Sequence, residues 1–317
     1  MLIRKCVLLI VAAGANASCF GASPVAIAAG IAQLEAEQSD VFMRLVYSSR
    51  VEQFPEFQKL VFSESPRMLE KLDRQTLEKR TSTDYVSIVV KGDVSSFARI
   101  VTEGTGPGEF AVLVQAVVNM GGRSRSWLYR KAPLSSIMLS LGKPALDVKQ
   151  DKPGLTVRSS ELPFGMVVGV LNRTSGDYRA NFGRIANVVE TAQNGPVRVA
   201  IEDSEWKHRI SFAESQGLAV PQSVVSEKNN GETRVETEVN YSPLRLAAAD
   251  RPFPRSIKTR KYVRIGNTYK AYLTITVDVL AATVLPPEEA KRVIDIETPN
   301  ALSAADLTQL LDIQSNQ

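Results

Sequence analysis

The chain has 317 residues, with 38 Lys and Arg against 34 Asp and Glu, so its formal net charge is only +4. The positive charge is not gathered into a compact basic cluster with interleaved aromatic residues, and no nucleic-acid partner is therefore expected. A chain of this length could form one large domain or two smaller ones, and we favour one, because no Pro-, Ser- or Gly-rich linker divides its middle.

The first residues have the pattern of an export signal. Arg4 and Lys5 form a basic start, residues 6–13 are a short apolar run, and residues 15–17 offer small side chains for cleavage. The run is too short to cross a bilayer, which takes roughly 20 apolar residues. We expect residues 1–17 to be a signal peptide and the mature chain to be periplasmic or extracellular, with outer-membrane association as a variant.

Cysteine usage agrees with this picture. Removal of the signal takes Cys6 away and leaves Cys19 as the only cysteine, so no intramolecular disulfide is expected. Lipid anchoring at Cys19 is the less favoured alternative, because Asn16 stands where a lipoprotein signal usually has Leu. No other segment is long and apolar enough to predict a transmembrane helix.

Most of the remaining chain has the alternation of half-buried strands. In residues 269–281 (YKAYLTITVDVLA) every second side chain is apolar, which predicts one apolar and one polar face. Turn residues separate such segments, among them the glycine-rich residues 104–108, residues 229–231 and residues 266–267. Because tight turns join antiparallel strands, the sequence predicts an antiparallel meander.

Helices are expected to be fewer. Residues 26–38 are alanine-rich, residues 66–80 and 133–141 carry apolar stripes, and Ser303 is placed to cap a short helix. Residues 151–183 stay open, because their glycines weaken both a helix and a strand.

Catalytic chemistry finds little support. His208 shares a strand face with Ile210 and Phe212 and has no recognisable partner, so we interpret it as a histidine at a strand start or sheet edge. One His and one mature Cys exclude the usual Cys/His zinc sites and a Cys-His protease. We predict no catalytic residue, no metal and no cofactor, with a carboxylate-dependent hydrolase as the remote alternative.

Two groups of side chains have a structural and a functional interpretation. Lys258, Arg260, Lys261 and Arg264 are divided between two faces by strand alternation, which favours a solvated strand. Trp127, which alternates with Tyr129, and Trp206 are typical of a sheet core, and the alternative is that they line a ligand cavity.

The order of these elements resembles the bacterial lipoprotein carrier superfamily, as a divergent secreted member. An N-terminal helix, a strand (VFMRLVYSSR), a helical insertion, a long meander and a second helical stretch follow each other over residues 31–285. The segments MGGRSRSWLYRKAP and LPFGMVVGVLNR are similar to the family's turn-then-aromatic strand and to the apolar segment after it. The late stretch FPRSIKTRKYVRIGNTYKAYLTITVDV is similar to the last hairpin of secreted members.

The resemblance implies a mainly β (α+β) fold: a single antiparallel, strongly curved, incomplete β-barrel of about 10–12 strands with a few helices across its concave side. We expect a signal peptide at 1–17, an N-terminal segment at 18–30 and a half-barrel domain at 31–285 with helical insertions near 66–80 and 133–141. A C-terminal tail with a short helix would occupy 286–317.

By the same resemblance, the concave face would hold a hydrophobic small molecule, a lipid or a lipidated protein without any enzymatic step. The expected ligand-binding residues are Tyr269, Leu273, Ile275, Val277, Val279, Val112, Val114, Trp127 and Tyr129. The competing hypothesis is an envelope scaffold whose concavity is filled by its own helices.

Overall fold

The computed structural model describes residues 23–55, 79–92, 94–103, 110–120, 123–129, 132–133, 147–149, 162–191, 197–246 and 249–293, in some strands by backbone alone. The described strands form one antiparallel sheet, curled and not closed, so the predicted mainly β half-barrel fold is confirmed. The sheet has 14 strands, more than expected, because it includes β6 and β7 of only two and three residues.

The strand bounds are β1 Phe42–Gln53, β2 Arg80–Lys91, β3 Val94–Glu103, β4 Phe110–Met120, β5 Arg123–Tyr129, β6 Ala132–Pro133, β7 Asp147–Lys149, β8 Asn187–Thr191, β9 Val197–Glu202, β10 Trp206–Ser215, β11 Leu218–Lys228, β12 Thr233–Leu246, β13 Ala249–Ile265 and β14 Thr268–Leu285. The helices are α1 Pro24–Ser39, α5 Pro163–Ser175, α6 Tyr178–Ile185 and α7 Pro287–Val293.

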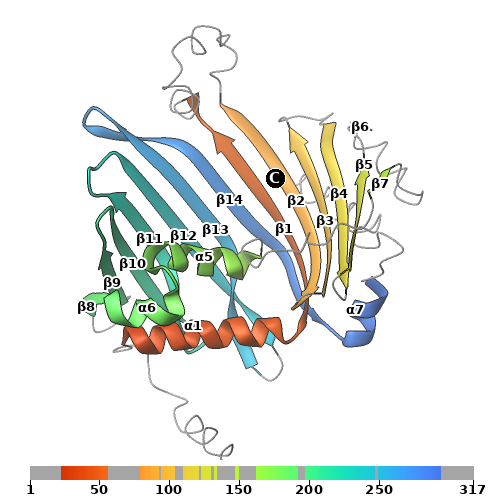
Figure 1. Cartoon of the computed structure of the whole chain (residues 1–317), viewed down its shortest axis with the longest axis horizontal. Helices are drawn as coiled ribbons and strands as arrows, with labels where there is room; N and C mark the ends of the chain where they lie inside the picture. Colours follow the sequence, from red (N-terminus) through yellow and green to blue (C-terminus); the bar gives the residue numbers. More distant parts are fainter. Residues whose placement is uncertain are drawn as a thin grey trace, which may run out of the picture.

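Strand β1 joins the early and late parts of the chain. It pairs with β2 on one side and with β14 on the other, and a meander runs outward from each neighbour, toward β7 and toward β8. Figure 1 shows β1 in the middle of the sheet, with the early strands on its right and the late strands on its left. The predicted meander is therefore present. In addition, its last strand, β14, pairs with the first strand, β1.

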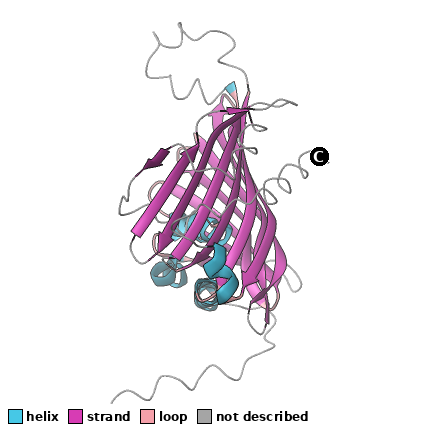
Figure 2. Ribbon diagram, turned by 90° about the vertical axis from the view of Figure 1, so that its right-hand side faces the viewer, coloured by secondary structure: helices cyan, strands magenta, loops and turns pink. Residues whose placement is uncertain are grey.

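Helices α1, α5 and α6 cover one face of the curled sheet, as the edge-on view in Figure 2 shows. Ser23 caps α1 by accepting a hydrogen bond from the Ala26 N–H at 3.3 Å, and Pro24 begins the helix. This confirms the helix expected at 26–38, although α1 runs on across residue 30, where a segment boundary was expected.

Of the segment left open by the sequence, 151–183, residues 151–161 lie outside the described residues, and the rest forms α5 and the start of α6. Phe164, Val167, Val168 and Leu171 are all buried, and their spacing of i, i+3, i+4 and i+7 is that of one helical face. Pro163 supplies a helical φ at the first turn, where its missing N–H costs nothing. The glycines are tolerated because the apolar face is buried on the sheet.

The remaining helix predictions concern segments that are not described. Residues 66–78 and 134–141 lie outside the described residues, as does the helix expected after Ser303. Within the described ends of the first two, Arg80 already begins β2 and Pro133 belongs to β6. Helix α7 follows β14 directly, in the part of the chain expected to form the tail.

The core lies between the three helices and the concave face. On the sheet side, Val239, Ile257 and Val277 stand opposite one another on β12, β13 and β14, each no more than 4% exposed. On the helix side, Phe182 of α6 packs edge-on against Phe212 of β10, with ring centroids 5.8 Å apart. We define the concave face as the face of these residues.

Two β-bulges interrupt the alternation of β14. Lys261 stands opposite Leu273 but Tyr262 stands opposite Ala271, so Tyr272 is the extra residue; Leu280 is the extra residue against β1. Each bulge exchanges the faces of the residues beyond it. Ala282 and Val284 thus pack on the core, whereas a continuous alternation would have placed Ala281 there.

Candidate ligand cavity

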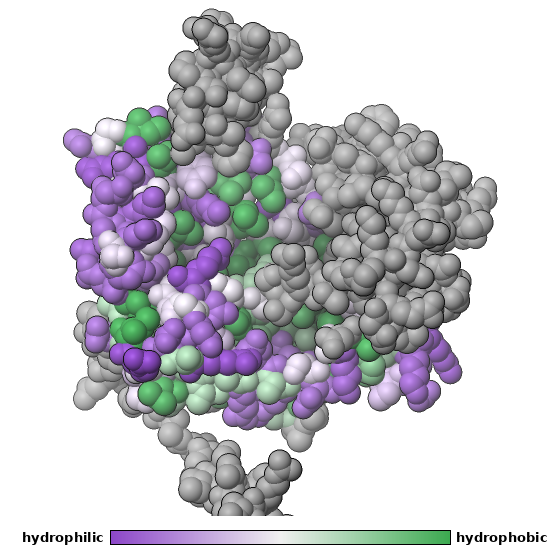
Figure 3. All heavy atoms as spheres, viewed as in Figure 1, coloured by the Kyte–Doolittle hydropathy of each residue, from purple (hydrophilic) through white to green (hydrophobic). Residues whose placement is uncertain are grey.

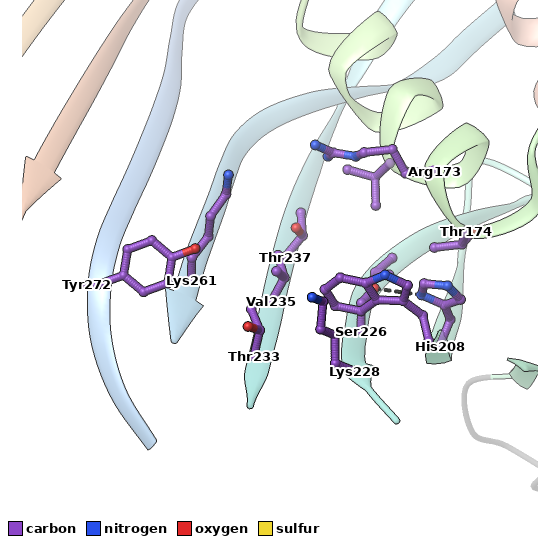
Figure 4. Close-up of a pocket in the computed structure, with 13 residues that line it drawn as sticks. Arg173, Thr174, His208, Ser226, Lys228, Thr233, Val235, Thr237, Lys261 and Tyr272 are labelled. Carbon is purple, nitrogen blue, oxygen red and sulfur yellow. Dashed lines mark hydrogen bonds between the residues drawn. The ribbon is translucent and has the colours of Figure 1, made fainter. Parts of the chain in front are cut away.

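A cavity of about 510 Å³ lies between α5 and the concave face of β10–β14 (Figure 4). Its size is within the usual range for pockets that hold small ligands. In the space-filling view of Figure 3, apolar surface gathers inside the curl of the sheet, and hydrophilic surface dominates the outer hairpins at the left. The residues that line the cavity are Val170, Arg173, Thr174, Trp206, His208, Val224, Ser226, Lys228, Thr233, Val235, Thr237, Lys261 and Tyr272.

The register of the strands explains why these side chains converge. Trp206 and His208 stand opposite Lys228 and Ser226 across β10 and β11, and Ser226 in turn stands opposite Val235 on β12. Residues that stand opposite each other in antiparallel strands point to the same face, so one concave stripe extends across the sheet. Helix α5 adds side chains from the other side.

Aromatic and hydroxyl side chains of the cavity wall contact one another on β10 and β11 and on β12 and β13. The Trp206 ring stacks on His208 with centroids 6.2 Å apart, and the Lys228 ammonium lies 5.9 Å from the Trp206 ring centroid. Thr237 is 3% exposed, and its hydroxyl lies 3.1 Å from that of Thr259. These contacts hold the side chains in place without a ligand.

His208 is buried, and only one of its two ring nitrogens has a hydrogen-bond partner. Its Nδ1 lies 2.8 Å from the Ser226 hydroxyl, whereas its Nε2 has no hydrogen-bond partner and is 3.9 Å from the nearer Asp203 carboxylate oxygen. Burial lowers the pKa of His208, and the neighbouring Asp203 charge opposes that shift without cancelling it. The histidine therefore stays neutral near pH 7. It lies near the start of β10, one of the two positions expected, and β10 is inside the sheet and not at an edge.

Ser226, His208 and Asp203 resemble a catalytic triad in composition only. The 3.9 Å separation is too long for the hydrogen bond that orients a triad histidine. The other Asp203 oxygen accepts the N–H groups of Glu205 and Trp206, both at 2.7 Å, which ties the carboxylate to its own turn and lowers its pKa. Ser226 lies within a strand paired on both sides, where backbone N–H groups serve the ladder and not an oxyanion.

Within the described ranges, no three His, Cys, Asp or Glu side chains lie close enough together to hold a metal ion. The described helices also include none with the length and apolar character needed to cross a membrane.

The predicted ligand-binding residues divide into three groups. Leu273, Ile275, Val277 and Val279 lie on the concave face, where Val277 and Val279 are core and Ile275 packs against it. Tyr269 lies on the opposite face, contrary to the continuous alternation expected, because the bulge at Tyr272 intervenes. Val112, Val114, Trp127 and Tyr129 belong to β4 and β5, and their side chains lie outside the described residues.

The opposite face is a charged, hydrogen-bonded surface. The Tyr262 hydroxyl donates to Glu236 at 2.9 Å, and Arg234 pairs with the same carboxylate at 2.5 Å. Arg260 pairs with Glu238 at 3.4 Å. The expected division of the basic residues of β13 is confirmed: Lys258, Arg260 and Arg264 take this face and Lys261 takes the other.

Several lining residues were not recognised in the sequence as site candidates. Arg173, Lys228 and Lys261 come from three separated elements, and only the register of the strands and the position of α5 bring them together. The alternation of β13 did separate Lys261 from its basic neighbours, but it did not say which face is concave. Trp206 was considered as core or cavity, and it lines the cavity.

Comparison with known proteins gives no family for the chain. No protein-family model matches it, and no curated protein matches its sequence. A crystal structure of a DUF1329 family protein from Desulfovibrio piger is distantly similar, with a TM-score of 0.32 and 8% identity over 86% of this chain and 100% of that chain. Similarity this low assigns no family, and the resemblance to lipoprotein carriers stays an expectation.

Proposed function

We propose that the chain is an exported, non-enzymatic binding protein that holds a hydrophobic ligand, an acyl chain or the acyl part of a lipidated partner. The observation that carries this proposal is the cavity of about 510 Å³ between α5 and the concave face. The export pattern of residues 1–17 and the resemblance to lipoprotein carriers support it from the sequence.

The lining favours a ligand with an apolar part. Val170, Val224 and Val235 present aliphatic surface from α5, β11 and β12, and Trp206 adds an aromatic wall. Burial of an acyl chain on such surface is worth about 0.8 kcal/mol per methylene. Binding by burial needs neither a reactive group nor a cofactor.

An envelope scaffold is the second candidate, and the packing of the helices supports it. Ile31 and Leu34 of α1, Leu171 of α5 and Phe182 of α6 are each no more than 2% exposed on the concave face. The protein thus fills part of its own concavity with its helices, and the cavity described above lies beside them, against β10–β14.

Native mass spectrometry of protein purified from its own host distinguishes a binding protein from a scaffold. For a binding protein, we expect an added mass of lipid size that is lost on delipidation and regained on lipid addition. Val235→Trp places a bulky ring in the cavity and should abolish the regain. Glu238→Trp is the matched control, because Glu238 lies on the same strand but on the opposite face. A clean apoprotein that takes up no lipid would contradict the proposal and favour the scaffold.

A further inference from the structure

The charged side chains that line the cavity in the described structure are all positive. Arg173 of α5, Lys228 of β11 and Lys261 of β13 all line it, and none of the described residues that line it is a carboxylate. None of these three cations forms an ion pair in the part of the chain that the structure describes. In Figure 4, Arg173 extends from α5 across the cavity toward β13, where Lys261 rises from the facing wall.

The carboxylates of the same strands are used elsewhere. Glu227 accepts a hydrogen bond from Tyr269, and Glu236 and Glu238 pair with Arg234 and Arg260, all on the opposite face. Successive side chains of a strand point to opposite faces. Lys228 directly follows Glu227 on β11, and Lys261 directly follows Arg260 on β13, so each lysine points to the concave face.

Asp203 is an acidic side chain close to the lining, and it forms no ion pair with these three cations in the described structure. It lies beside His208 at the β10 end of the cavity, 52% exposed, and it is held by the N–H groups of Glu205 and Trp206. His208 itself adds no positive charge near pH 7. Among the residues that the structure describes, the positive potential of the cavity is therefore left uncompensated.

A concave, partly apolar wall strengthens such a potential, because low-dielectric surroundings focus the field of the charges into the cavity. Lysine and arginine stems are apolar and can line a ligand's tail while their charged ends meet a polar group. The hydroxyls of Thr233 and Ser226 add hydrogen-bonding capacity beside the cations.

We propose that the ligand of this cavity is an amphiphile with an anionic head group, bound by Lys261, Arg173 and Lys228, with its apolar tail against Val170, Val224 and Val235. The inference deepens the proposed function and rests on it. An uncharged or cationic amphiphile would leave the three cations desolvated without a partner, which is unfavourable.

Calorimetric titration of the full-length mature chain below the critical micelle concentration tests the head group. Dodecanoate and dodecyl phosphate should bind at least about ten-fold more tightly than dodecanol, the gain of one charge-assisted hydrogen bond. Their advantage should shrink as salt is raised. Equal affinity for dodecanol and dodecanoate would overturn the head-group inference and leave the proposed function intact. Failure of all three to bind would contradict both.

Inorganic phosphate separates an amphiphile site from a simple anion site. It should compete with dodecyl phosphate only weakly, because it lacks the tail. Competition at equal concentrations would mean that the cavity recognises a free anion, and that result would overturn the amphiphile inference.

Single substitutions test whether the lysine inside the cavity binds the anionic head group. Lys261→Met keeps the apolar stem and removes the ammonium, and it should weaken dodecanoate about ten-fold with little effect on dodecanol. Lys261→Arg should retain binding. Lys258→Met is the matched control, because it removes the same charge from the same strand but from the opposite face. On that face, the charge of Lys258 helps to lower the pKa of Glu52. Equal losses in Lys261→Met and Lys258→Met would show a general effect of net charge and would contradict the inference.

Discussion

The hydroxyl of Tyr269 donates a hydrogen bond to the carboxylate of Glu227, 2.9 Å away, on the face of the sheet that points away from the cavity. The same hydroxyl lies 2.8 Å from the carbonyl oxygen of Gly231, in the turn between β11 and β12. Only three residues later, Tyr272 lines the cavity. The bulge in β14 thus gives two neighbouring tyrosines different roles.

Substitution of the two tyrosines tests this division. Tyr269→Phe should lower the free energy of unfolding by about 1 kcal/mol through the lost hydrogen bond and leave ligand affinity unchanged. Tyr272→Ala should weaken binding of a lipid probe about ten-fold, because it removes cavity surface. Urea unfolding and calorimetry measure the two effects. A loss of affinity in Tyr269→Phe equal to that in Tyr272→Ala would contradict the assignment of faces.

The ion pair between Glu37 and Arg251 ties α1 to β13. Arg251 donates two hydrogen bonds to the Glu37 carboxylate, at 2.6 and 2.8 Å. Glu37→Gln should therefore lower the free energy of unfolding by about 1 kcal/mol at neutral pH, allowing for partial solvent screening. Gln33, whose side chain also contacts Glu37, provides a control: Gln33→Ala should cost less.

The same pair predicts a pH dependence. Hydrogen bonding from Arg251 holds the pKa of Glu37 below its ordinary value of 4.5, so the folded chain binds this proton less readily than the unfolded chain. Its stabilisation is full above about pH 4.5 and is lost as the pH falls through the lowered pKa. Acid unfolding curves of Glu37→Gln should lose this contribution, and a curve parallel to that of the parent chain would contradict the pairing.

Phe182 of α6 packs against Phe212 of the sheet. Phe182 is 1% exposed, and its truncation would leave a cavity that the surrounding core fills only in part. Phe182→Ala should cost about 3–5 kcal/mol of unfolding free energy, and Phe182→Leu clearly less. Thermal denaturation gives the ranking. A loss below about 1 kcal/mol in Phe182→Ala would mean that α6 is not docked as described.

His208 is the only histidine of the chain, so its titration can be followed without ambiguity by NMR. Burial keeps its folded-state pKa below 6.5, which makes protonation favour the unfolded chain. Its contribution to stability is therefore full above about pH 6.5 and decreases as the pH falls below that value. Asp203→Asn should lower the pKa of His208 further. A folded-state pKa above 6.5 would contradict the burial of this side chain.

The Ser226–His208 contact has a chemical test as well. A fluorophosphonate probe labels activated serine nucleophiles, and we expect it to leave Ser226 unmodified. The histidine is not oriented by Asp203, and the described backbone beside the serine is engaged in strand pairing. Stoichiometric labelling that Ser226→Ala removes would support the hydrolase alternative instead.

Much of the fold was predictable because strands and tight turns leave local signals. The alternation of residues 269–281 and the turns at 229–231 and 266–267 correspond to β14 and to the hairpins around it. Gly266, with a φ of 62°, takes the left-handed conformation that its turn requires. Local patterns did not reveal the two bulges of β14, because a bulge depends on the partner strand.

The candidate site was less predictable, because it is a tertiary arrangement. Helix α5 was left open by its glycines, although the spacing of its buried residues is helical. The cavity also needs Lys228 and Lys261 on the same face as α5, and a sequence gives the phase of each strand without saying which phase is concave. Hence the alternation placed the aliphatic residues of β14 on one face, but none of them is among the residues that line the cavity, and the cations were not recognised.

Fluorescence quenching at Trp206 tests the central claim most directly. The chain has two tryptophans, so Trp127→Phe leaves Trp206, which lines the cavity, as the sole reporter. A brominated fatty acid bound in the cavity should quench its emission saturably, with the dissociation constant found by calorimetry, and Val235→Trp in the parent chain should block uptake of the same ligand. Calorimetric binding without quenching of Trp206, or no binding at all, would contradict a ligand between α5 and the concave face.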